Sequence, residues 1–471
     1  MVEGIGHQWA GVILAAGHGV RMKSRIPKVL HQVCGKELIR YPVELLRQLG
    51  VGTVVVVVSP DNGTRIRETL GDAVEYATQL EMKGTGDALT WALKQLNGRA
   101  EQLLVLNGDV PLLTLDSVRL LCQRHLEKAA ALSLLTAQTA AGQDLGRVIR
   151  DNQGRIVDIV EAGDRMGPPD HETPGHQAPD HQRVEVNVGV YCFSSGFLAA
   201  NLKRIEPNSQ GEKYLTSLVA LGAKSGEPIC SETCGDPDES MGVNNRLQLS
   251  QAEAIQRRRI LESWMLAGVT IQDPASVYIG GDVTVGQDSI ILANTALRGH
   301  TSIGEDCQIG PNSVIEDSAV GDGCRITASV LEEATVEAGV EIGPFSHLRP
   351  GAYLESGVHL GNYVEIKNSR LSTGAVCGHF SYLGDATIGA GVNIGAGTVT
   401  CNYDGRDKLP TVIEAGAFIG CDTMLVAPVT VGANAATGAG AVVTKDIPAA
   451  RLAVGMPARI VGRNRIRHQA P

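Results

Sequence analysis

The C-terminal half of the chain repeats an aliphatic residue at every sixth position. A first run is Ile279, Val285, Ile291, Leu297, Ile303, Ile309 and Ile315; after a short slip the register resumes at Val330, Val336, Ile342, Leu348, Leu354, Leu360 and Ile366, and a third run is Ile413, Ile419, Leu425 and Val431. A period of six matches neither the 3.6 residues of an α-helix nor the simple alternation of a lone strand. It is typical of a hexapeptide β-helix, whose axis is filled by these side chains. We therefore predict a parallel β-helix here.

Glycine directly follows many of these aliphatic residues, as in Ile303-Gly304 and Leu360-Gly361. We expect Gly or Asn at the corners of the coil, where a positive φ is needed. The alternative is a glycine-rich, β-prone segment of an ordinary sandwich. The unbroken spacing of the first run favours the β-helix.

The N-terminal half shows a different pattern. Short apolar runs at 10–16, 54–58 and 103–106 are separated by helix-like stretches. Continuous apolar strands that alternate with helices indicate a buried parallel sheet with helices on both faces. Ligands of such sheets bind outside the carboxyl ends of the strands. We expect the chemistry of this half just after the first and third runs, where polar residues cluster.

A long helix is predicted between the two halves. The stretch 245–266 is rich in Gln, Ala, Arg, Leu and Glu and contains no Gly or Pro. The resulting domain prediction is residues 1–244, a linker helix at 245–267, and residues 268–471. The segment 163–183 is rich in proline and histidine, and we interpret it as an inserted surface loop. The alternative, a metal-binding tract, is not favoured because the histidines lack the spacing of metal ligands.

Composition removes several classes of function. The net charge is −10, so the electrostatic footprint of a nucleic-acid-binding protein is missing. No apolar run reaches membrane length. The first ten residues lack the basic start and apolar core of a secretory signal. The ten cysteines contain no C-x-x-C pair, which is typical of reduced thiols in a cytoplasmic protein without a zinc site.

The most specific N-terminal motif is LAAGHGVRMKSRIPKVL. Gly17 and Gly19 would let the backbone approach a triphosphate, whose oxygens the loop amides can bind. Arg21 and Lys28 add two cations that neutralise phosphate charge while a phosphoryl bond breaks. The alternative, a tight strand-to-helix turn with solvated charges, does not account for the Pro-Lys that follows. We predict a nucleotide site.

With this motif and the solenoid pattern, nearly the whole chain resembles a bacterial family that fuses an N-acetylglucosamine-1-phosphate uridylyltransferase to a glucosamine-1-phosphate N-acetyltransferase. The resemblance implies a Rossmann-like, mixed-sheet α/β nucleotidyltransferase domain joined by a long helix to a left-handed parallel β-helix of hexapeptide repeats. It also implies UTP and acetyl-CoA as co-substrates, Mg²⁺ as cofactor, a homotrimer, and a product used in peptidoglycan and lipopolysaccharide synthesis.

The resemblance assigns site residues in the first half. Nucleotide contacts would be Leu14, Ala15, Ala16, Gly17, Arg21, Lys28, Gln79, Gly84 and Thr85; sugar and N-acetyl contacts Gly146, Glu161 and Asn187; and metal contacts Asp109 and Asn244. His18 stands where the family usually has Lys, Val20 where it has Thr, and Asn107 where Tyr is more usual. Mg²⁺ prefers a few hard oxygen ligands plus phosphate oxygens, which one Asp and one Asn can supply.

In the second half the resemblance points to His379, within CGHFSYLGDA, as the catalytic base. A lone histidine in a β-prone run is usually structural. A sugar amine attacks a thioester only when neutral, however, and an imidazole titrating near pH 7 can take its proton. Arg349, Lys367, Tyr382 and Asn393 match the sugar-phosphate residues of the family.

Acetyl-CoA would lie along the outside of the coil, at positions Ala396, Asn402, Tyr403, Cys421 and Ala439. The interruption 401–411 is predicted to be a loop thrown out of the coil. Cys421 stands where Ser is usual, and Met456 where the family has Arg. Arg459, Arg463, Arg465 and Arg467 could supply that charge, or they form a solvated basic tail.

Two other functions fit parts of the sequence. One is a different sugar-1-phosphate nucleotidyltransferase whose coil is only structural or regulatory; a base beside two phosphate-binding cations argues against it. The other is a non-catalytic assembly subunit. The joint presence of Arg21, Lys28, Asp109, Asn244 and His379 argues against that reading.

Overall fold

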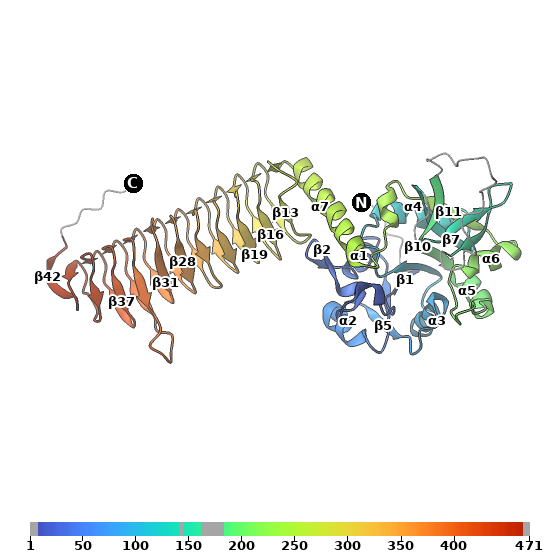
Figure 1. The fold of residues 1–471 in the computed structure, drawn as a ribbon, viewed down its shortest axis with the longest axis horizontal. Coiled ribbons are helices and arrows are strands. Elements are labelled where there is room, and N and C mark those ends of the chain that lie inside the picture. Colours follow the sequence, from blue (N-terminus) through green and yellow to red (C-terminus); the bar gives the residue numbers. More distant parts are fainter. Residues whose placement is uncertain (1–7, 141–144, 162–182, 465–471) are drawn as a thin grey trace. The chain divides into compact units, whose positions relative to one another are not determined.

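The computed structural model describes residues 8–140, 145–161 and 183–464, so residues 163–182 of the predicted loop lie outside the described part. The chain divides into two compact units, Met1–Gln256 and Arg257–Pro471 (Figure 1). Within the described ranges, no helix is long and apolar enough to cross a membrane.

A mixed sheet forms the centre of the N-terminal unit. Its strand order is β11 (Ile229–Thr233), β7 (Leu132–Ala140), β10 (Arg183–Ser194), β6 (Gln102–Asn107), β1 (Trp9–Leu14), β4 (Thr53–Val58) and β5 (Glu75–Thr78), with β8 (Arg147–Arg150) and β9 (Ile156–Val160) attached beside β10. β10 runs antiparallel to β6 and β7, whereas β1, β4, β5 and β6 are parallel. The three predicted apolar runs are β1, β4 and β6, as expected.

Both faces of this sheet are buried. Successive residues of β1 belong to different core clusters: Ile13 packs with Val56 and Leu104, and Val12 packs with Val55 and Leu103. The helices of the unit are α1 (Arg40–Gln48), α2 (Gly63–Leu70), α3 (Thr85–Leu96), α4 (Leu115–Glu127), α5 (Ser195–Asn201) and α6 (Ser217–Lys224). Burial on both faces explains why the strands are continuously apolar instead of alternating.

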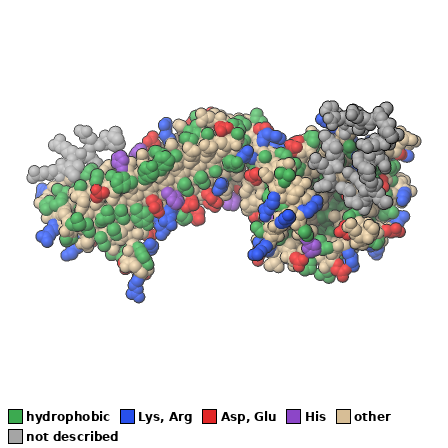
Figure 2. Space-filling model, in the orientation of Figure 1, with side chains coloured by type: hydrophobic (Ala, Val, Ile, Leu, Met, Phe, Trp, Pro, Cys, Tyr) green, Lys and Arg blue, Asp and Glu red, His purple; other side chains and the backbone are tan. Residues whose placement is uncertain are grey.

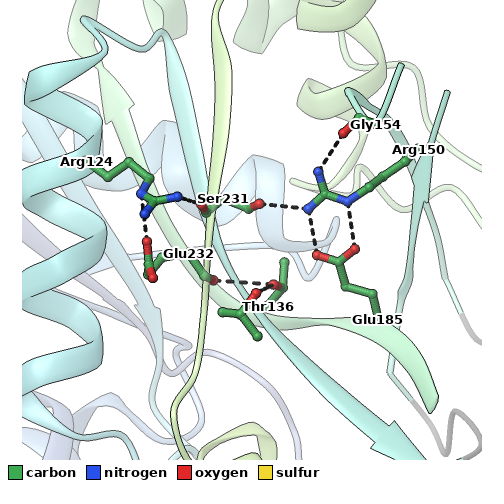
Figure 3. Close-up of polar contacts among 8 residues, drawn as sticks. Arg124, Thr136, Arg150, Gly154, Glu185, Ser231 and Glu232 are labelled. Carbon is green, nitrogen blue, oxygen red and sulfur yellow. Dashed lines mark hydrogen bonds and ion pairs between the residues drawn. The ribbon is translucent and has the colours of Figure 1, made fainter. Parts of the chain in front are cut away.

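Polar side chains connect the edge strand β11 to β8 and α4 (Figure 3). Arg150 of β8 donates to both carboxylate oxygens of Glu185 in β10, at 2.8 and 2.7 Å, and to Ser231 Oγ in β11 at 2.8 Å. From α4, Arg124 forms an ion pair with Glu232 at 2.7 Å. The Arg150 guanidinium, through its hydrogen bond, lowers the pKa of the Glu185 carboxyl.

The predicted long helix is α7 (Arg246–Leu266). Leu261 belongs to the core of the C-terminal unit, and Ile260 and Trp264 pack against that core. The last turns of α7 therefore cover the apolar end of the coil.

The C-terminal unit is a left-handed parallel β-helix, as predicted. Sheet I runs from β12 (Thr270–Ile271) to β42 (Arg459–Arg463), sheet II from β13 (Tyr278–Ile279) to β40 (Val442–Val443), and sheet III from β14 (Thr284–Val285) to β38 (Val429–Val431). From β12 to β40, successive strands visit the three sheets in turn and neighbouring coils pair in parallel, as Ile291 does with Ile309. The last two strands, β41 (Arg451–Val454) and β42, both belong to sheet I and pair antiparallel.

Every predicted axial residue is buried except Val330, which is 36% exposed. There the prediction was wrong by one position, since Leu331 is fully buried instead. Buried residues in this region are Ile315, Val320, Ile326, Leu331 and Val336, so three of the four steps are five residues long. Shortened turns, with positive φ at Asp317 and Glu333, account for the slip in the sequence pattern.

Corner residues with positive φ include Asn294, Asn312 and Gly323, as expected. Two glycines that follow axial residues, Gly310 and Gly343, also have a positive φ, of 101° each. The others, such as Gly304, serve a different purpose. A Cβ on Gly304 would lie 2.7 Å from the backbone carbon of Gly321 in the next coil. Glycine is needed there because neighbouring coils approach closely, and the expectation of positive φ does not hold at such positions.

The predicted loop is residues 402–410, between β34 (Val399–Cys401) and β35 (Thr411–Ile413). It projects from the coil in Figure 1, in orange. Arg406 and Lys408 are exposed on it, and Figure 2 shows positive side chains at its tip.

Candidate active sites

A cavity opens where β1, β4 and β6 end. Their order in the sheet brings these ends together: the Ala15 amide donates to Val57 O at 2.9 Å, and the Gly108 amide to Leu14 O at 2.9 Å. The space consists of two adjoining cavities of about 560 Å³ and 310 Å³. Leu14, Thr85, Asn107, Asp109 and Tyr214 line both.

All the N-terminal site residues predicted from the sequence line these cavities. The larger one holds Leu14, Arg21, Thr85, Asp109, Gly146, Glu161, Asn187 and Asn244, and the smaller one Leu14, Ala15, Ala16, Gly17, Lys28, Gln79, Gly84, Thr85 and Asp109. The sequence did not single out Tyr191, Tyr214 or Thr216, which also line the larger cavity.

The two glycines of the first loop have separate roles. A Cβ on Gly17 would meet nothing within 4 Å, so this position faces open space. Gly19 has a φ of 62°, and its Cβ would lie 2.6 Å from Lys28 Cβ. Asn62, which follows β4, fixes the start of the loop by donating to Ala15 O at 2.9 Å.

Two residues of this loop, His18 and Val20, differ from the family pattern, and both lie outside the cavities. Val20 is 82% exposed. His18 Nδ1 lies 3.6 Å from a carboxylate oxygen of Asp61, and both side chains are more than half exposed. Neither residue lines the cavities as the structure describes them.

A charged cluster links the loop to the far side of the cavity. Lys28 Nζ contacts the carboxylate of Asp109 and donates to Asn244 Oδ1 at 3.1 Å. Arg21 Nη2 donates to the same Asn244 oxygen at 3.0 Å. Two cations, one carboxylate and one carboxamide therefore meet at one point of the wall.

The oxygen atoms of Asp109 and Asn244 fit a magnesium ion. A carboxylate and a carboxamide oxygen are hard ligands, and Mg²⁺ usually takes one or two protein oxygens plus substrate phosphates. Among residues 8–140, 145–161 and 183–464, no group of three or more His, Cys, Asp or Glu side chains could hold a metal. A two-oxygen, substrate-completed site matches this donor set better than a resident metal would.

Gln79 is oriented by the protein. Its Nε2 donates to Gly84 O at 3.1 Å and to Asp87 Oδ2 at 2.9 Å, which uses both amide hydrogens. The amide oxygen is then the group left for a ligand that carries a hydrogen-bond donor. Thr85 Oγ1 accepts from the Leu215 amide at 2.9 Å, which joins this side of the cavity to the segment before α6.

The larger cavity also holds the predicted sugar contacts. Glu161 accepts a hydrogen bond from Thr216 Oγ1 at 2.7 Å. Asn187 Nδ2 donates to the Tyr191 hydroxyl at 2.6 Å. Position gave a weak signal for Tyr191, since it lies four residues after Asn187 on the same strand; Thr216 and Tyr214 follow no recognisable motif.

His379 is exposed at the corner between sheets I and II, just after β30 (Val376–Cys377). Ala396, Cys421 and Ala439 occupy the same corner in the three following coils. The backbone ladder shows the alignment, because Gly397 N donates to Phe380 O, Asp422 N to Ala396 O, and Gly440 N to Cys421 O. The corner thus places the predicted base at one end of the predicted acetyl-CoA positions.

The predicted phosphate contacts lie at the other edge of sheet II. Lys367, at the end of β28 (Val364–Lys367), pairs with Gly384 of β31 (Ser381–Gly384), and Arg349 lies one coil earlier. Arg349 donates to Glu365 at 2.9 Å. A Cβ on Gly384 would lie 2.3 Å from the Tyr382 hydroxyl, so Tyr382 reaches this edge too. Asn393 is separate, in sheet I.

A single chain therefore does not gather all the predicted acetyltransferase residues. Asn402 is buried at the edge near Gly384, where its Nδ2 donates to Asp385, and Tyr403 is 56% exposed on the loop. Met456 is 77% exposed at the end of the corner, and Arg459 pairs with Val454 across β41 (Arg451–Val454) and β42. Arg463 pairs with Arg451 in the same ribbon, and Arg465 and Arg467 lie outside the described residues.

Comparisons with known proteins agree with this two-part architecture. Residues 11–204 match the family model of the MobA-like NTP transferase domain, and residues 300–331 match that of the bacterial transferase hexapeptide. A solved structure described as a putative glucose-1-phosphate thymidylyltransferase from Bacillus anthracis is 18% identical, covers 52% of this chain and 94% of its own, and has a TM-score of 0.42.

Curated relatives extend over both halves. "Bifunctional protein GlmU" of Heliobacterium modesticaldum is 44% identical over 95% of each chain. The protein of the same name from Trichlorobacter lovleyi is 44% identical over 94% of this chain and 95% of its own, and that from Exiguobacterium sibiricum is 43% identical over 94% and 96%. The chain belongs to the GlmU family of bifunctional proteins, and it is an enzyme with a nucleotidyltransferase half and a hexapeptide acyltransferase half.

Proposed function

We propose that the chain acetylates glucosamine-1-phosphate from acetyl-CoA at the coil, and that its N-terminal cavity then transfers UMP from UTP to the N-acetylglucosamine-1-phosphate formed, releasing pyrophosphate. The observation that carries the proposal is the meeting of Arg21, Lys28, Asp109 and Asn244 at the cavity that Glu161 and Asn187 also line. Membership of a bifunctional family supports the pairing of the two activities.

In the N-terminal cavity, the sugar phosphate is already an anionic nucleophile. No side chain has to be activated, so catalysis comes from positioning and from neutralising the charge that builds up on the phosphate oxygens. Arg21 and Lys28 supply fixed positive charge. Asp109 and Asn244 would hold Mg²⁺, which supplies further neutralisation when bound. Glu161 and Asn187 would orient the sugar.

At the coil, His379 would remove the proton from the amine of glucosamine-1-phosphate as the nitrogen attacks the thioester carbon. The exposed imidazole can meet a substrate on the corner that also carries Ala396, Cys421 and Ala439. Arg349 and Lys367, from successive coils, would hold the phosphate, the first in a bidentate manner and the second as a point charge.

A second copy of the chain completes the acetyltransferase site in this proposal, within a homotrimer. His379 lies at one corner of sheet II, and Gly384, which neighbours Lys367, lies at the other end of β31, five positions further along the chain. Five extended residues cover about 16 Å, too far for one sugar phosphate to span. The corner next to His379 also exposes Phe345, Tyr363 and Phe380, at 56%, 62% and 57%. Figure 2 shows hydrophobic side chains over much of the coil face in view. Such exposed patches mark association surfaces.

The proposal includes a cytoplasmic location. All ten cysteines are free, which suits a reducing compartment.

A substrate panel on the full-length protein tests the function. Pyrophosphate release should require UTP and N-acetylglucosamine-1-phosphate, and free thiol release should require acetyl-CoA and glucosamine-1-phosphate. A preference for another nucleotide, or thiol release that never exceeds the rate without enzyme, would refute the corresponding half.

A further inference from the structure

Strand β10 bulges where it lines the larger cavity. Asn187 pairs with Thr136 and Tyr191 with Leu134, so four steps along β10 face two steps along β7. In a regular strand, residues four apart are separated by about 13 Å. Here Asn187 Nδ2 donates to the Tyr191 hydroxyl at 2.6 Å. The bulge brings together two side chains that a regular strand would keep apart.

The direction of this hydrogen bond is fixed by a third group. The Gly189 amide, which can only donate, lies 3.1 Å from Asn187 Oδ1. Oδ1 must therefore face Gly189, and Nδ2 must face Tyr191. Because an amide nitrogen cannot accept, the Tyr191 oxygen is the acceptor. In the part of the chain that the structure describes, no protein group accepts the Tyr191 O–H in return.

Burial keeps the Tyr191 side chain neutral, and ring stacking holds it in place. Tyr191 is only 5% exposed. Burial, and then the charge of Glu161, raise its pKa, so the hydroxyl keeps its proton. The ring stacks on Phe193 with centroids 5.7 Å apart, and Phe193 stacks in turn on Phe197 at 6.4 Å. The cavity wall thus presents two neighbouring donors, the Tyr191 O–H and the second N–H of Asn187.

We propose that these two donors together bind the acetamido carbonyl oxygen of N-acetylglucosamine-1-phosphate, and that Tyr191 is a specificity-determining residue of uridylyl transfer. A carbonyl oxygen has two lone pairs and can accept from both donors at once. The 2-hydroxyl of glucose-1-phosphate lacks that carbonyl. This inference rests on the proposed function, since it names what recognises the sugar in the same cavity.

The substitution Tyr191→Phe removes the hydroxyl and leaves the stacked ring. We expect the KM for N-acetylglucosamine-1-phosphate to rise about 3- to 10-fold, as for one lost hydrogen bond. The kcat, the KM for UTP and the competitive Ki of glucose-1-phosphate should stay within about twofold, because none of them depends on the carbonyl contact. A purely structural tyrosine would affect both sugars alike.

Tyr76→Phe is a matched control. It also deletes a tyrosine hydroxyl, which here donates to Gly71 O at 2.6 Å, but Tyr76 lines neither cavity. Its kinetics should equal those of the wild type.

The inference is overturned if Tyr191→Phe leaves the KM unchanged, or if the KM and the Ki of glucose-1-phosphate rise together. If circular dichroism shows that Tyr191→Phe is unfolded, a substrate analogue tested on the wild-type enzyme still decides between the outcomes. The 2-thioacetamido sugar phosphate carries a weaker acceptor, and its KM should be at least about threefold higher; equality refutes the inference. A wild type without pyrophosphate release would instead refute the proposed function itself.

Discussion

The N-terminal cavity gathers residues from positions as far apart as Leu14 and Asn244, whereas the C-terminal corner places His379, Ala396, Cys421 and Ala439 at steps of one coil. A layered α/β unit can surround a ligand, because the loops beyond several strands converge at one edge of the sheet. A coil offers only neighbours in register along an open surface. The walls of a ligand site on the coil must therefore come from a loop such as 402–410 or from another chain.

The largest effect should come from inactivating each site separately. His379→Ala should lower thiol release by about 10²–10⁴-fold, the usual contribution of a general base, and leave pyrophosphate release unchanged. Asp109→Ala should do the reverse. Both products are measured on the same preparations. Loss of both activities in a folded variant would show that the two sites are not independent.

Breaking the association of chains should affect the activities of the two units almost as differently: the acetyltransferase should be lost and the uridylyltransferase retained. Tyr363→Asp puts a charge in the exposed aromatic corner, where losing an aromatic anchor costs about 2 kcal/mol or more. Analytical ultracentrifugation should show smaller particles, and thiol release should fall more than about tenfold, with pyrophosphate release retained. Leu120→Asp, at a 51% exposed position on α4, is the control. An acetyltransferase active as a monomer would contradict the shared site.

Two glycines sharpen the comparison further. Gly304→Ala forces a Cβ against the next coil and should cost about 1–3 kcal/mol of the coil's free energy of unfolding, followed in urea by Trp264 fluorescence. Gly17→Ala meets no protein atom, so stability should change by less than about 1 kcal/mol while the KM for UTP rises. The opposite pattern would mean that these glycines have been assigned the wrong roles.

The smallest effect concerns the Arg150–Glu185 pair. The folded-state pKa of Glu185 is lowered from its usual 4.5, so the pair stabilises fully above that value and progressively less as the pH falls through the folded pKa. Arg150→Met should lose about 1–2 kcal/mol of the N-terminal unit's stability at neutral pH. In urea titrations the gap from the wild type should shrink in acid. A gap that does not change with pH would assign the loss to packing.

Sequence periodicity was sufficient for the coil because each axial residue is specified by a local rule. It failed at Val330, where five-residue steps replace six and Leu331 takes the axis. It also gave the wrong reason for several glycines after axial residues, such as Gly304, which has no positive φ. Their purpose depends on how near the next coil lies, which is a property of the assembled stack.

Less of the N-terminal site could be predicted from the residues alone. Gly17, Arg21 and Lys28 form a motif whose chemistry can be read directly, whereas Gly146, Glu161 and Asn187 were found only through resemblance. Tyr191 was predicted by neither route, because its position four residues after Asn187 is only a weak signal. Its role arises from a bulge that shortens the distance to Asn187, and no spacing rule for a regular strand predicts that approach.

The pairing of Ile291 with Ile309 has a consequence for how such a chain can change in length. Deleting one residue within a strand would turn the later aliphatic side chains of the coil toward water unless a neighbouring turn shortens to compensate, as the turns between Ile315 and Val336 do. Removing or duplicating one whole winding needs no such compensation. Genes for this protein should thus vary mainly by complete windings and at turns, including turns that extend outward as residues 402–410 do.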